Sequence, residues 1–385
     1  MEDWHMAGCV LFSPTTTNFP TFFVRLRQPL ALKISYHCQV CHASTSEKPT
    51  TEDQDIHSLL KILPHDVRDN LLAHSKKDQL LEVTLDLGRV PQASYFGDFC
   101  RRNLRKTEVS VEEIEYVENG IGQLGGDNRA GIAGTLHRIS AIRNKNGKVV
   151  GLTCRVGRPI RDNMDMIRDL LEYGKSILFL GRPGVGKTTV MRGISRVLSD
   201  ELHKRVIIVD SSNEIGGDGD IPHPSIGRAR RLQVPKPWMQ HKVMIEAVEN
   251  HMPEVIIVDE ISTEAEVHAC RTIAQRGVML IGSAHGKTLD NLMKNPTLSD
   301  LIGGLKTVIL SDQEARTRNR QKSILERRAA PAFPFLIEMR ERHYWVAHRT
   351  DKSVDAVLHG KKPLVEVRRR DEQFKAVIER WRIED

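Results

Sequence analysis

The chain has 385 residues, of which 39% are hydrophobic and 28% are charged, and its formal net charge at pH 7 is +7. This length allows two or three domains with a sizeable core, and no apolar run approaches the ~20 residues of a membrane-spanning helix. Six widely scattered cysteines argue against a disulfide framework and for a reducing compartment. The mild positive charge permits an anionic partner such as nucleic acid but does not require one.

Residues 1–46 have the composition of an organellar transit peptide. After the third residue the segment contains no acidic residue, and it is rich in serine and threonine with a few basic residues. The hydroxyl bias favours the chloroplast over the mitochondrion, and a disordered cytosolic extension is the alternative. The segment from Cys38 to His42 matches the pattern for covalent haem attachment, but a short match without its structural context is weak.

Residues 47–160 predict a small α+β domain. Apolar residues recur at helical spacing over 56–72, where a proline splits them into two short helices, and alternate with polar residues over 81–87 as in a half-buried strand. A further helix is expected over 110–124. The pair Asn146-Gly147 then predicts a hairpin turn between two strands.

Residues 161–310 predict a doubly wound parallel sheet, because continuous apolar segments alternate with helical ones. The expected strands cover 177–180, 206–210, 255–260 and 278–285. Ligands of such sheets bind at the carboxyl ends of the strands, so polar residues that follow these segments are candidate site residues.

A glycine-rich loop follows the first of these strands and precedes a helix. Gly181, four residues and then Gly186-Lys187-Thr188 satisfy the Walker A spacing. The glycines let backbone amides turn towards phosphate oxygens, and the helix directs its positive dipole end at the same place. Lys187 can reach the β and γ phosphates, and Thr188 can place its hydroxyl on Mg²⁺. The expected nucleotide-binding residues are Gly181, Arg182, Pro183, Gly184, Val185, Gly186, Lys187, Thr188 and Thr189.

Acidic residues and a histidine follow the neighbouring strands. Asp259 stands in the Walker B position, where a carboxylate holds Mg²⁺, and Glu260 beside it could orient or deprotonate the attacking water. Asp210 or Glu214 could face the γ-phosphate as a second acid, with a cap or a solvated loop carboxylate as the alternative. His285 could sense the γ-phosphate, or it is a core histidine with satisfied partners.

Three arginines lie between the two acidic strands, at Arg228, Arg230 and Arg231. One of them could act as an arginine finger towards the nucleotide of a neighbouring subunit, neutralising charge in the transition state. The alternative is a solvated basic loop.

Residues 311–385 predict a basic C-terminal extension. The run 316–322 could bind a phosphate backbone, but it lacks interleaved aromatic residues, so a plain charged surface is the preferred interpretation. Segments 335–339 and 344–348 predict a hairpin, and a charged helix is expected over 371–382.

The order of these motifs resembles that of the RecA-like ring ATPases of type II and type IV secretion and of pilus retraction. A closer resemblance is to stage III sporulation protein AA and its AAA-type relatives encoded in algal plastid genomes and plant nuclei. Three stretches carry it, and together they indicate a resemblance over roughly residues 55–350. They are Arg129–Ile132 through Arg155–Arg158, the Walker A loop, and His285–Leu289 through Asn295–Gly304.

This resemblance implies a small N-terminal domain joined to a RecA-like ATPase core, assembly into rings, and a plant organelle. It supports the functional interpretation of Glu214, Glu260, His285 and Arg228. The chain departs from secretion ATPases in having Asp259-Glu260 where they have a Gly-Glu pair. It also lacks the Arg-x3-His motif with which some plant relatives bind single-stranded nucleic acid, so that activity is not carried over.

The sequence therefore predicts an organellar ATPase that uses Mg²⁺ to hydrolyse ATP to ADP and phosphate as an oligomeric ring. Its candidate catalytic residues are Lys187, Glu260, Glu214, His285 and Arg228, and its candidate metal ligands are Thr188 and Asp259. Two other functions remain open: a nucleotide-dependent binding module with little hydrolysis, and a nucleic-acid-associated ATPase that uses the basic region after residue 316.

Overall fold

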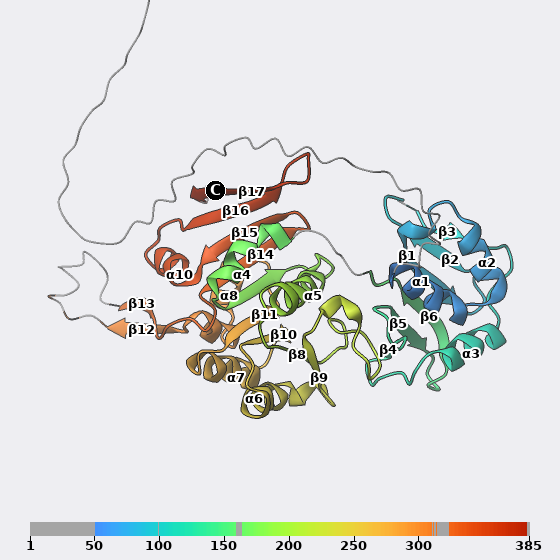
Figure 1. Cartoon of the computed structure of the whole chain (residues 1–385), viewed down its shortest axis with the longest axis horizontal. Coiled ribbons are helices and arrows are strands. Elements are labelled where there is room, and N and C mark those ends of the chain that lie inside the picture. The colour runs from blue at the N-terminus through green and yellow to red at the C-terminus, as the bar shows by residue number, and fades with distance from the viewer. Residues whose placement is uncertain are drawn as a thin grey trace, which may run out of the picture. The chain divides into compact units, whose positions relative to one another are not determined.

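A computed structural model describes residues 51–98, 100–158, 164–309, 311, 313 and 323–382 (Figure 1). The predicted transit segment 1–46, the haem-like segment from Cys38 to His42 and the basic run 316–322 lie outside these residues. Among the helices that the structure describes, none combines the length and apolar character needed to cross a bilayer.

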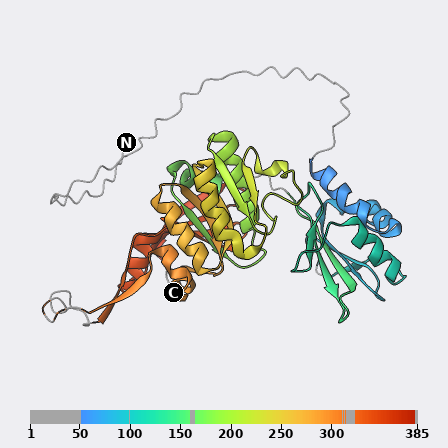
Figure 2. The same ribbon diagram turned by 90° about the horizontal axis from the view of Figure 1, so that it is seen from below.

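The N-terminal part of the described chain is an antiparallel sheet packed against three helices (Figure 2). The sheet has the order β3-β2-β1-β6-β5-β4. Its strands are β1 (Leu80–Asp86), β2 (Gln92–Tyr95), β3 (Arg102–Asn103), β4 (Arg129–Gly131), β5 (Arg138–Arg143) and β6 (Val149–Arg155), and the helices are α1 (Thr51–Ile62), α2 (His65–Ala73) and α3 (Val111–Gly120). The predicted helices, the strand near residue 81 and the hairpin at Asn146-Gly147 are confirmed.

The second sheet has nine strands in the order β17-β16-β15-β14-β7-β11-β10-β8-β9. From β14 to β9 all neighbours are parallel, whereas β14 to β17 form an antiparallel meander. The strands are β7 (Ile177–Gly181), β8 (Val206–Asp210), β9 (Arg230–Gln233), β10 (Val255–Ile261), β11 (Met279–Ala284), β14 (Phe335–Glu341), β15 (Tyr344–Arg349), β16 (Leu364–Arg370) and β17 (Ala376–Arg382). The predicted parallel sheet is confirmed, and it continues beyond residue 310 into the C-terminal strands.

Helices cover both faces of this sheet, as its apolar strands require. In β7, Leu178 and Leu180 join one hydrophobic cluster while Ile177 and Phe179 join another. Residues of α4 (Arg168–Tyr173) and α5 (Lys187–Arg196) complete the second cluster. The first cluster is completed by residues of α6 (Gln240–His251), α7 (Glu264–Gln275), α8 (Leu289–Lys294) and α10 (Thr350–Leu358). The chain thus has the doubly wound, RecA-like P-loop fold.

A separate antiparallel ribbon, β12 (Leu305–Ile309) and β13 (Ser323–Arg327), precedes the C-terminal strands. The hairpin predicted over 335–348 is confirmed as β14 and β15. The helix predicted over 371–382 is wrong, because residues 376–382 form β17 and pair with β16. Charged residues of this segment pair across the strands instead, as Arg380 does with Glu366.

We expect Ile257→Ala to lower the free energy of unfolding by roughly 2–5 kcal/mol, because it leaves a cavity in the centre of the parallel sheet. Ile257 is fully buried in β10. Ile309→Ala is the matched control: this side chain is 81% exposed, so its loss should change stability by less than about 0.5 kcal/mol. Chemical denaturation of both variants measures the difference, and equal effects would contradict the packing described above.

Candidate functional site

The glycine-rich loop joins the carboxyl end of β7 to the start of α5. Gly184 and Gly186 have φ angles of +78° and +107°, which only glycine adopts without strain, and they bend the loop around the helix terminus. The amide of Gly181 donates to the carbonyl oxygen of Gly286 at 2.8 Å. The loop is therefore anchored to the segment that carries His285.

The first amides of α5 have no side-chain cap. At the starts of α3 and α7 a serine or threonine and a glutamate form reciprocal capping boxes, whereas Gly186 caps α5 without a side-chain hydrogen bond. The first turn of α5 also contains no acidic residue. These amides and the positive end of the helix dipole are suited to an anion such as a phosphate group.

The side chain of Lys187 folds back onto the glycine-rich loop that precedes it. Its Nζ donates to the carbonyl oxygens of Gly181 at 2.8 Å and of Arg182 at 3.3 Å. Burial lowers the pKa of Lys187, and the negative charges of Asp259, Glu260 and Glu214 oppose that shift. The structure thus brings Lys187 together with three of the acids that the sequence singled out.

Asp259 is a buried carboxylate at the end of β10, and Ser283 of β11 holds it in place. The Ser283 hydroxyl donates to Asp259 Oδ1 at 3.3 Å and accepts from the backbone amide of Glu260 at 3.2 Å. Burial raises the pKa of Asp259 to about 7, with further contributions from the charges of Glu214, Asp210 and Glu260. Sequence reasoning missed the role of Ser283, although the residue stands directly before Ala284 and His285.

The protein oxygens at this place suit Mg²⁺ that arrives with a phosphate ligand. The described residues contain no group of three or more His, Cys, Asp or Glu side chains that could hold a metal alone. Magnesium commonly takes one or two protein ligands and completes its shell with water and substrate phosphates. Asp259 on β10 and Thr188 on α5, which packs against β10, are the candidate protein ligands for such an ion.

Glu260 and His285 lie at the mouth of the site and contact each other. His285 Nε2 pairs with Glu260 Oε1, and both side chains are more than half exposed. Glu260 has a positive φ angle of +42°, and Gln240 donates to the carbonyl oxygens of Asp259 and Glu260 at 3.1 and 3.3 Å. An exposed carboxylate on a fixed backbone, next to an imidazole, is well placed to meet water.

Asp210 and Glu214 have different environments. Asp210 is fully buried and accepts from the amide of Gly216 at 2.8 Å, and burial raises its pKa. It therefore anchors the following loop from inside the core, and it is neither a helix cap nor a solvated loop carboxylate. Glu214 is partly exposed and pairs with Arg138 of β5.

Two arginines hold the loop after β8 in place. Sequence reasoning did not assign either of them to this loop. The buried Arg192 of α5 donates to the carbonyl oxygens of Glu214 and Ile215 at 2.5 and 2.8 Å. Arg231 donates to the carbonyl oxygens of the loop glycines Gly217 and Gly219. Arg231, one of the three candidates for an arginine finger, thus supports a loop of its own chain.

Arg228 lies away from the phosphate loop of its own chain. It precedes β9 and lines a separate cavity of about 300 Å³ with residues 203–207, at the amino ends of the parallel strands. The phosphate loop lies at their carboxyl ends. Asp200 fixes the backbone here by accepting from the Arg228 amide at 2.8 Å.

Comparison with known proteins identifies relatives of the chain. The family model described as "Sporulation stage III, protein AA" matches residues 109–330. The chain is 56% identical over 325 residues to "Uncharacterized protein ycf45" of Porphyra purpurea, covering 84% of this chain and 57% of that protein. It is 52% identical over 329 residues to "Protein SEEDLING PLASTID DEVELOPMENT 1" of Arabidopsis thaliana, covering 84% and 48%. The chain thus spans about half the length of these two relatives.

Among solved structures, the chain is similar to the ATPase DotB of Legionella pneumophila, with 15% sequence identity and a TM-score of 0.47. The similarity covers 78% of this chain and 86% of DotB. The term AAA-type, used above for the plastid and plant relatives, needs correction. AAA ATPases are a different class from the RecA-like proteins to which this fold corresponds.

We expect Asp259→Asn to stabilise the metal-free protein far more at pH 8 than at pH 4. The folded-state pKa of about 7 lies above the ordinary 3.8. Stability from this group is therefore fully present below pH 4 and is lost as the pH rises through 7. Removing the charge should recover a few kcal/mol at pH 8.

Melting temperatures in a chelating buffer at both pH values test this expectation. Asp290→Asn is the control, because that carboxylate is exposed on α8 and its replacement should change stability by less than about 0.5 kcal/mol at either pH. A gain for Asp259→Asn that does not depend on pH would contradict the burial argument.

Proposed function

The chain belongs to the sporulation stage III protein AA family, and we propose that it is a Mg²⁺-dependent ATPase that hydrolyses ATP to ADP and phosphate. The observation that carries this proposal is the uncapped start of α5, with Lys187 beside the buried Asp259. Amides, a lysine and a protected carboxylate are what a triphosphate and its metal need at a parallel-sheet edge.

Each residue of the proposed site has a separate role in hydrolysis. Lys187 and the amides of α5 stabilise negative charge on the phosphate oxygens as the bond to the γ-phosphorus breaks. Thr188 and Asp259 would hold Mg²⁺, which neutralises phosphate charge when it is bound. Glu260 orients the attacking water and accepts its proton while the ADP oxygen leaves.

His285 and Glu214 complete the proposed catalytic set. His285 contacts the carboxylate of Glu260. If either side chain takes a new partner, the other loses this contact. Glu214 lies close enough to Lys187 and Asp259 to interact with both charges. We assign to these two residues the positioning of Glu260 and of the water.

We further propose that the protein works as an oligomer in which Arg228 serves a neighbouring subunit. The position of Arg228 at the opposite edge of the sheet supports this, because the side chain is remote from its own phosphate loop but exposed on the surface. A guanidinium supplied by a neighbour would neutralise transition-state charge that the chain's own residues leave uncovered.

A plastid location is part of the proposal. The name of the Arabidopsis relative refers to seedling plastid development. The acid-poor, hydroxyl-rich segment 1–46 supports the same location.

We expect Lys187→Ala to lower ATP turnover at least ~100-fold, because it removes the cation that stabilises the transferred phosphoryl group. Glu260→Gln should lower turnover to a similar degree while ATP binding is retained, since it removes only the base. Glu264→Gln, on an exposed residue of the first turn of α7, is the matched control and should keep full activity.

Phosphate release and equilibrium ATP binding are measured side by side. Turnover in Lys187→Ala equal to that of the wild type would refute the ATPase proposal. Tight ATP binding by the wild type without turnover would favour the nucleotide-dependent binding module instead.

A mixing experiment tests the shared site. Specific activity should rise with protein concentration, and Arg228→Ala should lower it ~10³-fold or more if Arg228 acts as an arginine finger. Mixing inactive Arg228→Ala with inactive Lys187→Ala should restore part of the activity, because some interfaces then contain both intact residues. Arg276→Ala, an exposed arginine of the turn after α7, is the control. No recovery on mixing, with activity independent of concentration, would exclude sharing.

A further inference from the structure

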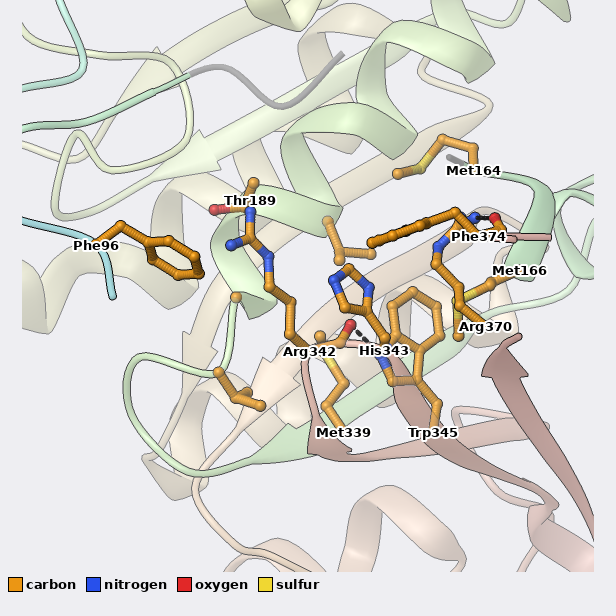
Figure 3. Close-up of a pocket in the computed structure, with 13 residues that line it drawn as sticks. Phe96, Met164, Met166, Thr189, Met339, Arg342, His343, Trp345, Arg370 and Phe374 are labelled. Carbon is orange, nitrogen blue, oxygen red and sulfur yellow. Dashed lines mark hydrogen bonds between the residues drawn. The ribbon is translucent and has the colours of Figure 1, made fainter. Parts of the chain in front are cut away.

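A cavity of about 370 Å³ opens beside the phosphate loop (Figure 3). Gly186 and Thr189 line one side of it, so the cavity starts where the loop ends and α5 begins. Its other walls include Met164, Met339 and Trp345. The lining is mainly apolar and aromatic, unlike the charged site at Lys187.

Two turns of the C-terminal meander reach into this cavity. The turn between β14 and β15 contributes Arg342 and His343. The end of β16 contributes Arg370, and the turn between β16 and β17 contributes Phe374. The rings of His343 and Phe374 meet edge to face, with centroids 5.9 Å apart and an interplanar angle of 82°. They form an aromatic wall opposite α5.

Phe374 presents an exposed ring from an uncommon backbone conformation. Its φ angle is +59°, which a bulky residue rarely adopts, and its side chain is 65% exposed. Arg370 donates to the Phe374 carbonyl oxygen and pairs with Asp165 at 2.7 Å. The turn is thus held in a strained form that presents an aromatic ring to the cavity.

His343 is suited to contact with an uncharged ring. Burial and the positive charges of Arg342 and Arg370 lower its pKa, which favours the neutral imidazole. The Trp345 indole beneath it donates to the Arg342 carbonyl oxygen at 3.2 Å and packs edge-on against Phe179. The wall is therefore supported from the core of the sheet.

We propose that this cavity binds the purine base of the nucleotide, packed against Phe374 and His343. The inference rests on the proposed function, since it places the base of a nucleotide whose phosphates lie on the loop. A phosphate chain at Gly184 to Thr188 leaves its nucleoside near Thr189, where the cavity begins. An aromatic wall and thioethers bind a purine through its faces and edges.

The base is selected by ring size rather than by its polar edge. Among the described residues that line the cavity, none is Asp, Glu, Asn or Gln. A carboxylate, which can accept from guanine N1–H and N2–H together, is therefore absent from this described lining, as is an amide that could read adenine on both edges. ATP and GTP should bind within about tenfold of each other, and CTP more weakly than both.

The test compares nucleotides with inorganic tripolyphosphate, which has no base, by calorimetric titration of the full chain in Mg²⁺. Phe374→Ala should weaken ATP binding roughly tenfold and leave tripolyphosphate binding unchanged. Phe374→Tyr should retain ATP binding. Trp381→Ala, an exposed aromatic of the same hairpin that does not line the cavity, should alter neither ligand.

Phe374→Gly separates a binding role from a structural one. Because glycine adopts a positive φ angle without strain, this variant should not lower the melting temperature, yet it should weaken ATP binding as much as alanine does.

An unchanged ratio of ATP to tripolyphosphate affinity in Phe374→Ala would overturn the placement of the base, and a difference above tenfold between ATP and GTP would overturn selection by size. Failure of the wild-type chain to bind either ATP or tripolyphosphate would instead overturn the proposed function.

Discussion

The placement of several carboxylates around one lysine is the constraint on which the rest of this site depends. Asp259 is buried, and the charges of Asp210, Glu214 and Glu260 all act on it. Lys187 interacts with Asp259, Glu260 and Glu214. Such a concentration of negative charge is costly in a buried setting. It is favourable only with cations present, which is a physical argument for the proposed binding of metal together with phosphate.

The parallel sheet makes this concentration possible. Strands β7, β10 and β11 run in the same direction, so the phosphate loop, Asp259 and His285 meet at one edge although more than 70 residues separate the first from the second. Ser283 and Gln240 then fix the backbone at Asp259 and Glu260 by hydrogen bonds. Preorganisation of this kind lowers the reorganisation needed when charge develops.

The C-terminal strands and the N-terminal sheet also contribute residues at the carboxyl ends of the parallel strands. Strand β14 pairs in parallel with β7, and the turns of the meander beyond it supply His343 and Phe374 beside the loop. On another side, Arg138 of β5 pairs with Glu214, and Asp218 of the same acidic loop accepts from the amide of Gly131 at 3.1 Å. The loop that carries Glu214 is thus bonded to the N-terminal sheet as well as to α5.

The sequence by itself determined the local features: the strands of the core, the helix after the loop, and the places of Gly181, Lys187 and Asp259 at the ends of these elements. These follow from short-range periodicity and from a motif whose residues are neighbours. Only the tertiary structure decided the partners that come from distant segments. Ser283 on Asp259, Arg192 under the acidic loop and Phe374 beside Thr189 depend on strand order.

The misassigned segment 371–382 illustrates the same limit. Its charges fit a helix surface equally well until β16 is beside it, where Glu366 pairs with Arg380 across the strands. Cross-strand pairing is a non-local contact, so no periodicity within the segment reveals it.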